Sequence, residues 1–558
     1  MPQLSWVGKD KVKNHHHEVP FHLLDKIRDF QAAPGKPDNR RDNILIHGDN
    51  LLALKSLLPE FGGRVNCIYI DPPYNTGNEG WVYNDNVNDP RIQKWLGAVV
   101  GKEGEDLSRH DKWLCMMYPR LKLLKQLLAD DGVIFISIDD NEQAHLKLVC
   151  DEIFGRNRFV AQIPWRKRTA KSDVPFGVSQ DFESILCYSK SDDFLAGVQG
   201  KERRYYETDD FPNRPWRTHD LTKQTTAEER PNSFFTMIDP KTGKKYPANP
   251  NATWRITKDT FQEYYDTKKI VFPDDYDFLK ISKPVMRYFK DDDIAKAEKA
   301  GKTFGQVAVS TLLPEKVGMT QDGTKEITEI FGSKIFNFPK PSSLIEYLLE
   351  VSTNEDSIVL DSFTGSGTTA HAVLNLNKRD GGDRRFIGIE MMDYAENIIA
   401  ERIRRVINGY GTKPEIQQGT GGGFSFYRVG DALFDAEQNL NPAAPVESVR
   451  RYIAYTEGLP ASALPEHERP PENGENPPEN PVSPYFLGMK DGVAYLFHYE
   501  PDRATDLSLD FLQTIRTEML PEKPERWVIY ADRTLLSQEQ MKQLGIVFKR
   551  IPRDISKL

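Results

Sequence analysis

The tetrapeptide Asp-Pro-Pro-Tyr stands at residues 71–74, directly after an apolar, β-branched run from Val65 to Ile70. The run predicts a buried strand, and the tetrapeptide then lies at the carboxyl end of that strand. In open α/β sheets, the ligand crevice lies outside the carboxyl ends of the strands. The two prolines fix φ and remove backbone donors, but they keep their carbonyl groups. The segment therefore predicts an α/β fold with a hydrogen-bond-accepting loop at its ligand crevice.

A second pattern of strand, glycine turn and helix begins about 290 residues further along the chain. A short apolar run at 357–360 leads into Asp361, then into a turn with glycines at 365 and 367, and a helix-like stretch follows at 370–376. Glycines let a backbone approach a ligand closely, and a helix amino terminus favours a carboxylate or another polar group. The turn lacks the third glycine of a dinucleotide fingerprint and the Gly-Lys-Ser/Thr of a P-loop. The pattern therefore favours a nucleoside-type ligand that is neither a dinucleotide nor a nucleotide held by a P-loop.

Acidic residues follow two further predicted strands. Residues 386–389 run into Glu390, about 20 residues past Gly367, where a nucleoside ribose needs an acidic partner. Residues 43–46 predict a strand that leads to Asp49 and a helix through Leu58. A plain helix cap is the alternative role for Asp49.

The tetrapeptide resembles the DPPY motif of amino-group DNA methyltransferases, and residues 71–86 are similar to the modification subunits of type III restriction-modification systems. Phe363 with the two glycines resembles the FxGxG loop of S-adenosylmethionine-dependent methyltransferases. The catalytic motif precedes the cofactor motif, which resembles the circularly permuted β class of these enzymes. The related glutamine methyltransferases carry an NPPY loop and the opposite order, so they are disfavoured.

This resemblance implies transfer of a methyl group from S-adenosylmethionine to the N6 amino group of a flipped adenine. Asp71 and the carbonyl of Pro72 would hold the amino hydrogens, and Tyr74 would stack on the base, with Pro73 completing the catalytic loop. The segment 336–344, which includes Pro341, resembles the part of the family that closes the cofactor pocket. The implied cofactor residues are Asp49, Asp361, Phe363, Gly365, Gly367, Glu390 and Pro341.

The fold expected from these patterns is a circularly permuted Rossmann-like sheet with an inserted target-recognition domain and a small carboxyl-terminal α/β module. Seven strands with flanking helices are expected, including strands at 132–138 and 184–189 and a helix at 114–128. Residues 19–30 form an amphipathic stretch, and the long polar segment 75–111 is interpreted as a mobile loop that faces DNA. The predicted parts are an amino-terminal extension (1–40), a catalytic half (41–190), a target-recognition domain (191–330), a cofactor half (331–440), an acidic Pro-rich linker (441–484) and an interaction module (485–558).

Composition favours a cytoplasmic protein of several domains. The chain has 558 residues, a mean hydropathy of −0.58 and no apolar stretch near the ~20 residues of a membrane span. Its first residues lack the layout of a secretory signal. The four cysteines are interpreted as small buried hydrophobes, and neither they nor His15, His16 and His17 predict a metal site.

The net charge of −9 counts weakly against a site-specific DNA enzyme, because local clustering of cations matters more. Basic and aromatic residues gather between 165 and 217 and predict contact with double-stranded DNA; they are Trp165, Arg166, Lys167, Arg168, Lys171, Lys201, Arg203, Arg204, Arg214, Trp216 and Arg217. A solvated charged face is the alternative for each group.

The resemblance further implies a homodimer, and a helicase-nuclease restriction subunit or other defence proteins as partners. Two other functions stay open: an N4-cytosine methyltransferase, for which a Ser-Pro-Pro-Tyr loop would be expected, and a noncatalytic DNA-recognition subunit of a defence complex.

Overall fold

A computed structural model describes residues 4–35, 42–75, 109–169, 177–194, 196–199, 204–299, 304–307, 309–459, 482–520 and 522–553. The predicted DNA-facing loop therefore lies almost entirely outside the described residues. The chain divides into two compact units, one of residues 1–194 and 310–558 and one of residues 195–309. Among the described helices, none has the length and apolar character needed to cross a membrane.

A nine-stranded mixed sheet forms the centre of the first unit. The six strands from β19 to β4 form five parallel pairs, and the pairs at both edges of the sheet are antiparallel. The spatial order is β1 (His22–Gln31), β19 (Gly423–Ala432), β2 (Asn43–His47), β18 (Arg385–Glu390), β17 (Ile358–Asp361), β3 (Val65–Ile70), β4 (Leu128–Ile138), β6 (Phe182–Ser189) and β5 (Phe159–Arg166).

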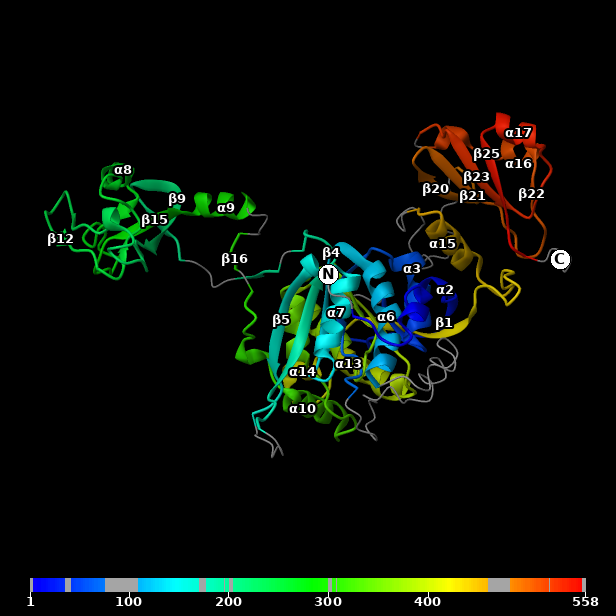
Figure 1. Ribbon diagram of the computed structural model, residues 1–558, viewed down its shortest axis with the longest axis horizontal. Helices are drawn as coiled ribbons and strands as arrows, with labels where there is room; N and C mark the ends of the chain where they lie inside the picture. Colours follow the sequence, from blue (N-terminus) through cyan, green and yellow to red (C-terminus); the bar gives the residue numbers. More distant parts are fainter. Residues whose placement is uncertain are drawn as a thin grey trace. The chain divides into compact units, whose positions relative to one another are not determined.

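Strands β3 and β17 are neighbours at the centre of this sheet, although they lie about 290 residues apart in sequence. They pair in parallel, with Val359 beside Cys67 and Leu360 beside Ile68. Because parallel strands end at the same edge, the segments after Ile70 and Asp361 emerge side by side. Figure 1 shows the blue-to-cyan and the green-to-yellow parts of the chain joined in one body. This is the permuted Rossmann-like arrangement that the motif order predicts.

Helices on both faces bury the sheet. Ile358 and Leu360 belong to the same apolar core as α3 (Asn50–Phe61), α6 (Arg109–Leu127) and α7 (Gln143–Ile153), whereas Val359 between them is buried outside that core. Such two-sided burial explains why these strands read as continuous apolar runs. Apart from those of the carboxyl-terminal module, the other described helices of this unit are α1 (Lys9–Val12), α2 (His15–Glu18), η1 (Arg156–Arg158), η3 (Glu315–Val317), α10 (Thr320–Phe331), α11 (Ser342–Glu350), α12 (Thr368–Asp380), η4 (Ala395–Ala400), α13 (Glu401–Asn408), α14 (Pro414–Gln417) and α15 (Val446–Thr456).

The edges of the sheet differ from the sequence expectation of seven strands. The amphipathic stretch of the amino-terminal extension is strand β1, which pairs with β19. Strand β5 was not expected, and its Trp165 is buried rather than exposed to DNA, with its indole nitrogen donating to Gly318 O at 3.0 Å. In the sequence, Trp165 stands directly before three cations at 166–168. This pattern did not indicate that one face of β5 packs on the sheet.

The unit of residues 195–309 consists of short strands around two apolar clusters. Trp216 and Trp254 belong to these clusters, so their rings are core. Residues 310–330, predicted as part of the same domain, belong to the first unit. The elements are β7 (Val198–Gln199), β8 (Tyr206–Thr208), β9 (Phe211–Asp220), β10 (Thr222–Lys223), η2 (Pro231–Ser233), β11 (Met237–Ile238), β12 (Lys245–Tyr246), β13 (Thr253–Trp254), α8 (Phe261–Asp266), β14 (Ile270–Val271), β15 (Val285–Phe289), α9 (Lys290–Lys299) and β16 (Gln306–Val307).

A small four-stranded sheet follows near the carboxyl end, in the order β20-β21-β23-β25. Its first two strands form the expected hairpin, whose turn places Asp491 and Gly492 at positive φ. Helix α15 lies within the predicted linker, of which residues 460–481 are outside the described part. The elements are β20 (Phe486–Lys490), β21 (Val493–Phe497), β22 (Asp506–Leu507), α16 (Leu509–Gln513), η6 (Thr517–Met519), β23 (Arg526–Ala531), β24 (Arg533–Thr534), α17 (Gln538–Gln543) and β25 (Ile546–Arg550).

Candidate active site

A cavity of about 420 Å³ opens at the carboxyl ends of β3 and β17. Polar side chains from both halves of the first unit surround it, together with several aromatic rings. Its lining residues are Tyr69, Asp71, Tyr74, Asp139, Lys167, Arg168, Thr169, Glu183, Thr320, Gln321, Phe336, Asn337, Phe338, Pro339, Lys340, Asp361, Phe363, Thr364, Gly365, Ser366, Thr368 and Thr369. A volume of this size falls in the range of small-molecule sites.

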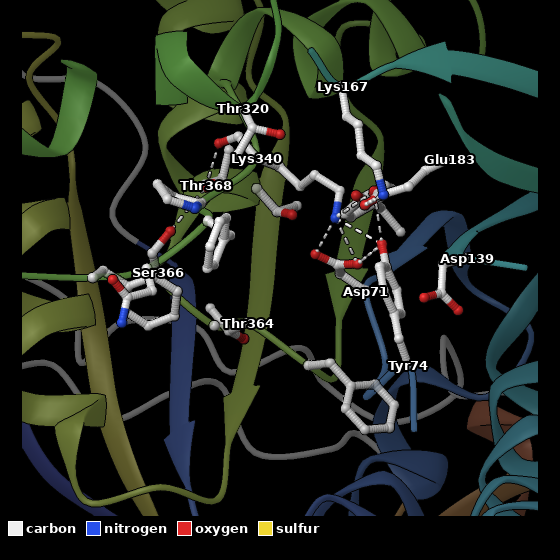
Figure 2. A pocket seen from close by; sticks show the side chains of 18 of the residues that line it. Asp71, Tyr74, Asp139, Lys167, Glu183, Thr320, Lys340, Thr364, Ser366 and Thr368 are labelled. Atoms are coloured by element: carbon white, nitrogen blue, oxygen red, sulfur yellow. Dashed lines mark hydrogen bonds and ion pairs between the residues drawn. The ribbon is translucent and has the colours of Figure 1, made fainter. Parts of the chain in front are cut away.

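Four side chains meet at the β3 end of the cavity (Figure 2). The Tyr74 hydroxyl donates to Asp71 Oδ1 at 2.7 Å and lies 3.1 Å from Glu183 Oε2. The Lys340 ammonium lies 2.9 and 2.7 Å from the two Asp71 oxygens and 2.8 Å from the Tyr74 hydroxyl. Its distance to Glu183 Oε2 is 3.4 Å. The predicted Asp71 and Tyr74 are therefore in one network with a lysine from the cofactor half.

Burial and charge act in opposite directions on these groups. Burial raises the pKa of Asp71, and the Lys340 ammonium acts against that shift. The pKa of Glu183 is lowered, because Lys340 and Lys167 outweigh the effect of burial. The neighbouring carboxylates of Asp71 and Glu183 likewise hold the pKa of Lys340 above its usual value, although burial opposes them. Two carboxylates and one ammonium thus share a site that excludes most water.

The two prolines of the loop 71–74, for which a catalytic role is predicted, have different surroundings. The carbonyl of Pro73 accepts a hydrogen bond from the buried indole of Trp113 at 2.6 Å, so it serves the fold. Neither Pro72 nor Pro73 lines the cavity with its side chain. The next residue, Asn75, donates to Glu142, which is 0% exposed, and so ties the loop to the start of α7.

Glu142 also holds two histidines, and this cluster has the spacing of a metal site. His110 Nδ1 and His145 Nδ1 lie 2.7 and 2.9 Å from its two oxygens, and the possible ligand atoms all lie within 4.8 Å of one another. The contacts present already use both oxygens. We therefore interpret the cluster as structural: the two histidines hold the Glu142 carboxylate where it accepts from Asn75.

The glycine turn after β17 forms the opposite wall of the cavity. Gly365 donates its backbone N–H to Glu390 Oε2 at 3.0 Å, and Gly367 caps α12 at a φ of 83°. The carboxylate of Glu390 also accepts from the backbone of Met392. Glu390 therefore braces the turn through two backbone bonds, and it does not line the cavity.

Arg402 from α13 fixes the same turn from behind. Its guanidinium is fully buried and donates to Ser366 O at 3.1 Å, to Ser366 Oγ at 2.9 Å and to Thr368 Oγ1 at 3.0 Å. An ion pair with Glu326 at 3.2 Å balances its charge. No sequence motif pointed to this residue, because its partner segment lies more than 30 positions away.

Asp361 lies between the two walls. Its carboxylate accepts from the backbone of Phe363 at 3.0 Å and from the Thr369 hydroxyl at 2.5 Å. Burial raises the pKa of Asp361 to about 7, and the nearby charges of Asp71 and Glu390 act in the same direction.

The remaining predicted cofactor residues lie beside the cavity. Asp49 caps α3 by accepting from the backbone of Leu51 at 2.7 Å, which is the alternative role considered for it. Pro341 precedes the first turn of α11. Of the predicted residues, Asp71, Tyr74, Asp361, Phe363 and Gly365 line the cavity, whereas Pro72, Pro73, Asp49, Gly367, Glu390 and Pro341 do not.

Comparison with known proteins agrees with this geometry. The sequence model of the DNA methylase family, N6_N4_Mtase, matches residues 65–401. The StyLTI Mod subunit of a type III restriction-modification enzyme from Salmonella typhimurium is 32% identical over 75% of this chain and 62% of its own length. The EcoPI Mod subunit of Escherichia phage P1 is 32% identical over 69% of this chain and 63% of its own length. The type II methyltransferase M.KpnI of Klebsiella pneumoniae is 30% identical over 66% of this chain and 84% of its own length.

The chain thus spans under two thirds of the length of the two Mod subunits. The family match itself covers the catalytic loop, the inserted unit and the glycine turn, and M.KpnI is matched over most of its length. The chain belongs to the DNA methylase family.

Proposed function

We propose that the protein is a site-specific DNA methyltransferase that transfers a methyl group from S-adenosylmethionine to the N6 amino group of a flipped adenine. The observation that carries the proposal is the meeting of Asp71 and Tyr74 after β3 with the glycine turn after the adjacent β17, around one cavity. The names of the Mod-subunit relatives and of M.KpnI support the same activity.

The cavity has the chemistry that S-adenosylmethionine requires. Buried backbone and hydroxyl groups at the start of α12 suit its carboxylate, and Asp361 suits a positive charge. The rings of Phe336, Phe338 and Phe363 offer faces for a sulfonium and for flat rings. The resemblance implies that Glu390 holds the ribose and Asp49 the adenine, and for this the ligand must extend beyond the lining of the cavity, since Glu390 braces the glycine turn and Asp49 caps α3. When bound, this cofactor supplies an electrophilic methyl group.

The residues of the catalytic loop prepare the amino nitrogen. The ionised Asp71 carboxylate and the Pro72 carbonyl accept the two amino hydrogens, since Pro73 O is already bonded to Trp113. Holding both hydrogens makes the nitrogen lone pair available, and the Tyr74 ring stacks on the base to fix its position. As the new N–C bond forms, the bond between the methyl carbon and the sulfonium sulfur would break and the sulfur would leave as a neutral thioether; the nitrogen then releases one proton, and the Asp71 carboxylate is the acceptor beside it. No covalent enzyme intermediate is involved.

Methyl transfer from labelled S-adenosylmethionine to mixed-sequence duplex DNA tests the proposal. Nucleoside mass spectrometry identifies the methylated base, and Asp71→Ala is the matched variant. We expect N6-methyladenine with the native protein and a loss of at least about 100-fold in the variant, with cofactor affinity largely kept. N4-methylcytosine would overturn the choice of base. If the protein binds S-adenosylmethionine but methylates neither adenine nor cytosine, the result would favour the noncatalytic DNA-recognition function.

The proposed assembly is the one that the resemblance to type III modification subunits implies. We propose that residues 195–309 read double-stranded DNA, that the protein works in the cytoplasm as a homodimer, and that a helicase-nuclease restriction subunit or another defence protein is its partner. In the unit 195–309, Arg214 and Arg217 pair with Asp291 and Asp293 of α9, so these two cations are partly neutralised before DNA binds.

A further inference from the structure

Lys340 lies in the segment 336–344, whose resemblance implied closure of the cofactor pocket, but the sequence assigned no role to the lysine itself. Its side chain is 9% exposed, and its ammonium lies within 2.9 Å of both oxygens of Asp71 and of the Tyr74 hydroxyl. Glu183 lies on the other side of the ammonium, at 3.4 Å. An ammonium group has three hydrogens to donate. All three therefore have acceptors within the site.

The backbone of Lys340 is held in place by three independent features. Phe338, two residues earlier, has a φ of 51°, which is uncommon for an aromatic residue. Gly323 of α10 leaves room for the chain, since a Cβ there would come within 2.3 Å of Pro339 O and 2.9 Å of Lys340 O. Thr368 of the glycine turn donates its hydroxyl to Lys340 O at 3.2 Å. The position of the ammonium is thus built into the packing of α10, α11 and α12.

We propose that Lys340 is a positioning residue that keeps Asp71 ionised, and that Glu183 holds the lysine in place from the opposite side. The inference rests on the proposed function, because an ionised Asp71 is what the amino group of the target base requires. A protonated carboxyl group would present an O–H donor where the amino hydrogen needs an acceptor.

The surroundings of Asp71 explain why it needs a cation. The Asp71 side chain is 24% exposed, and a carboxylate shielded from most water without a cation beside it takes up a proton more readily; burial already raises the pKa of Asp71. Glu183 raises it further, and Lys340 and the Tyr74 hydroxyl oppose both effects. The titratable groups that face Asp71 or its partners are Tyr69 of β3, Tyr74 of the loop, Asp139 after β4, Lys167 after β5, Glu183 of β6, Lys340 before α11 and Asp361 of β17.

The first test is the pH dependence of kcat in Lys340→Met, a variant of similar length without charge. We expect the acidic limb of the profile to move to higher pH, so that the rate falls about tenfold for each pH unit below the raised pKa. Lys340→Arg keeps the charge and is expected to keep the limb within about half a unit. A Lys340→Met profile of unchanged shape, even at a lower overall rate, would overturn the proposal.

The second test needs neither cofactor nor DNA. The free energy of unfolding is measured from pH 5 to pH 9 for the native protein, Lys340→Met, Asp71→Asn and the double variant. In Lys340→Met the folded-state pKa of Asp71 lies above its unfolded value, so stability relative to the native protein should decrease as pH rises through that pKa. The double variant should lack this decrease. Parallel curves for all four proteins would contradict the role assigned to Lys340.

These tests separate the two proposals. An inactive native protein would count against the methyltransferase activity, whereas the unfolding measurements would still report on Lys340. If Lys340→Met does not fold, infrared difference spectra of the native protein and Asp71→Asn show the charge of Asp71 directly. The carboxylate band is expected at pH 7, and a protonated carboxyl band at that pH would overturn the inference. Lys316→Met, which removes an exposed lysine, is the matched control for folding.

Discussion

At the scale of single residues, Asp361 is a buried carboxyl group of the cavity whose charge changes near neutral pH. Burial raises its pKa to about 7, so the side chain takes up a proton as pH falls through that value. A neutral Asp361 no longer attracts the positive charge of S-adenosylmethionine. We expect the affinity for this ligand to decrease by up to about tenfold for each pH unit below 7 and to level off above it. Calorimetric titration between pH 5.5 and 8.5 measures this.

Asp361→Asn is the control for that prediction, because it keeps a side chain of the same shape without the ionisation. Its affinity should vary little with pH, and an equally steep decrease in this variant would assign the pH effect to another group. The effect on folding has the opposite sign. A folded-state pKa above the unfolded value of about 3.9 gives a contribution to stability that is present at low pH and is lost as pH rises through 7.

The sequence predicted the residues of the site that follow strands and missed those that reach it from elsewhere. Asp71, Tyr74, Asp361 and Phe363 could be predicted, because a strand followed by a polar or glycine-rich turn indicates a place at the sheet edge. Lys340 follows no strand, and nothing in its own segment indicates that it reaches Asp71 across 269 positions. Only the pairing of β3 with β17 gives that information, and this pairing is a long-range contact.

At the scale of elements, the glycine turn depends on a guanidinium from another helix. Arg402 donates to Ser366 and Thr368 and lies 3.1 Å from His371 Nδ1, so it closes the turn onto α12. In Arg402→Met these acceptors lose their donor and Glu326 loses its ion pair. Breaking such a buried pair costs roughly 3–5 kcal/mol. We expect a lower midpoint of thermal unfolding and at least about tenfold weaker binding of S-adenosylmethionine.

Arg404→Met is the matched control on the same helix. Arg404 is exposed and pairs with Glu401, and exposed pairs contribute at most about 1 kcal/mol. In Arg404→Met, the midpoint of thermal unfolding and the affinity for S-adenosylmethionine should both stay close to those of the native protein. Equal losses in the two variants would mean that α13 is sensitive to any arginine replacement, and the brace assigned to Arg402 would be wrong.

The inner strands of the sheet were predictable, and its edges were not. Inner parallel strands are buried on both faces and therefore read as continuous apolar runs, as β3, β4 and β18 do. Strand β5 has one buried face only, and its cations suggested DNA contact instead. The edge strand β1 alternates weakly and contains several charged residues, so its pattern indicated an amphipathic stretch without specifying a strand.

At the scale of the whole molecule, the carboxyl-terminal sheet shares an apolar core with elements at the edge of the large sheet of the same unit. Phe497 and Tyr530 of that sheet belong to one buried cluster with Leu23 of β1 and Val449 and Ile453 of α15. The Tyr530 hydroxyl also bonds to Glu457 after α15. The module therefore packs directly against the elements that close one edge of the large sheet, although sequence alone presented it as a separate part behind a linker.

Shared packing predicts a shared unfolding transition. Phe497→Ala removes a fully buried ring from the common core, which costs about 3–5 kcal/mol. The proposed S-adenosylmethionine site is the cavity of the same unit, so this ligand should raise the midpoint of the transition that the variant lowers. Differential scanning calorimetry with and without the ligand measures both shifts. Leu544→Ala, at an exposed position of the same module, should leave the midpoint unchanged. Phe497→Ala could lower the midpoint of a transition whose midpoint the ligand does not change. That result would show that the module unfolds independently of the methyltransferase sheet.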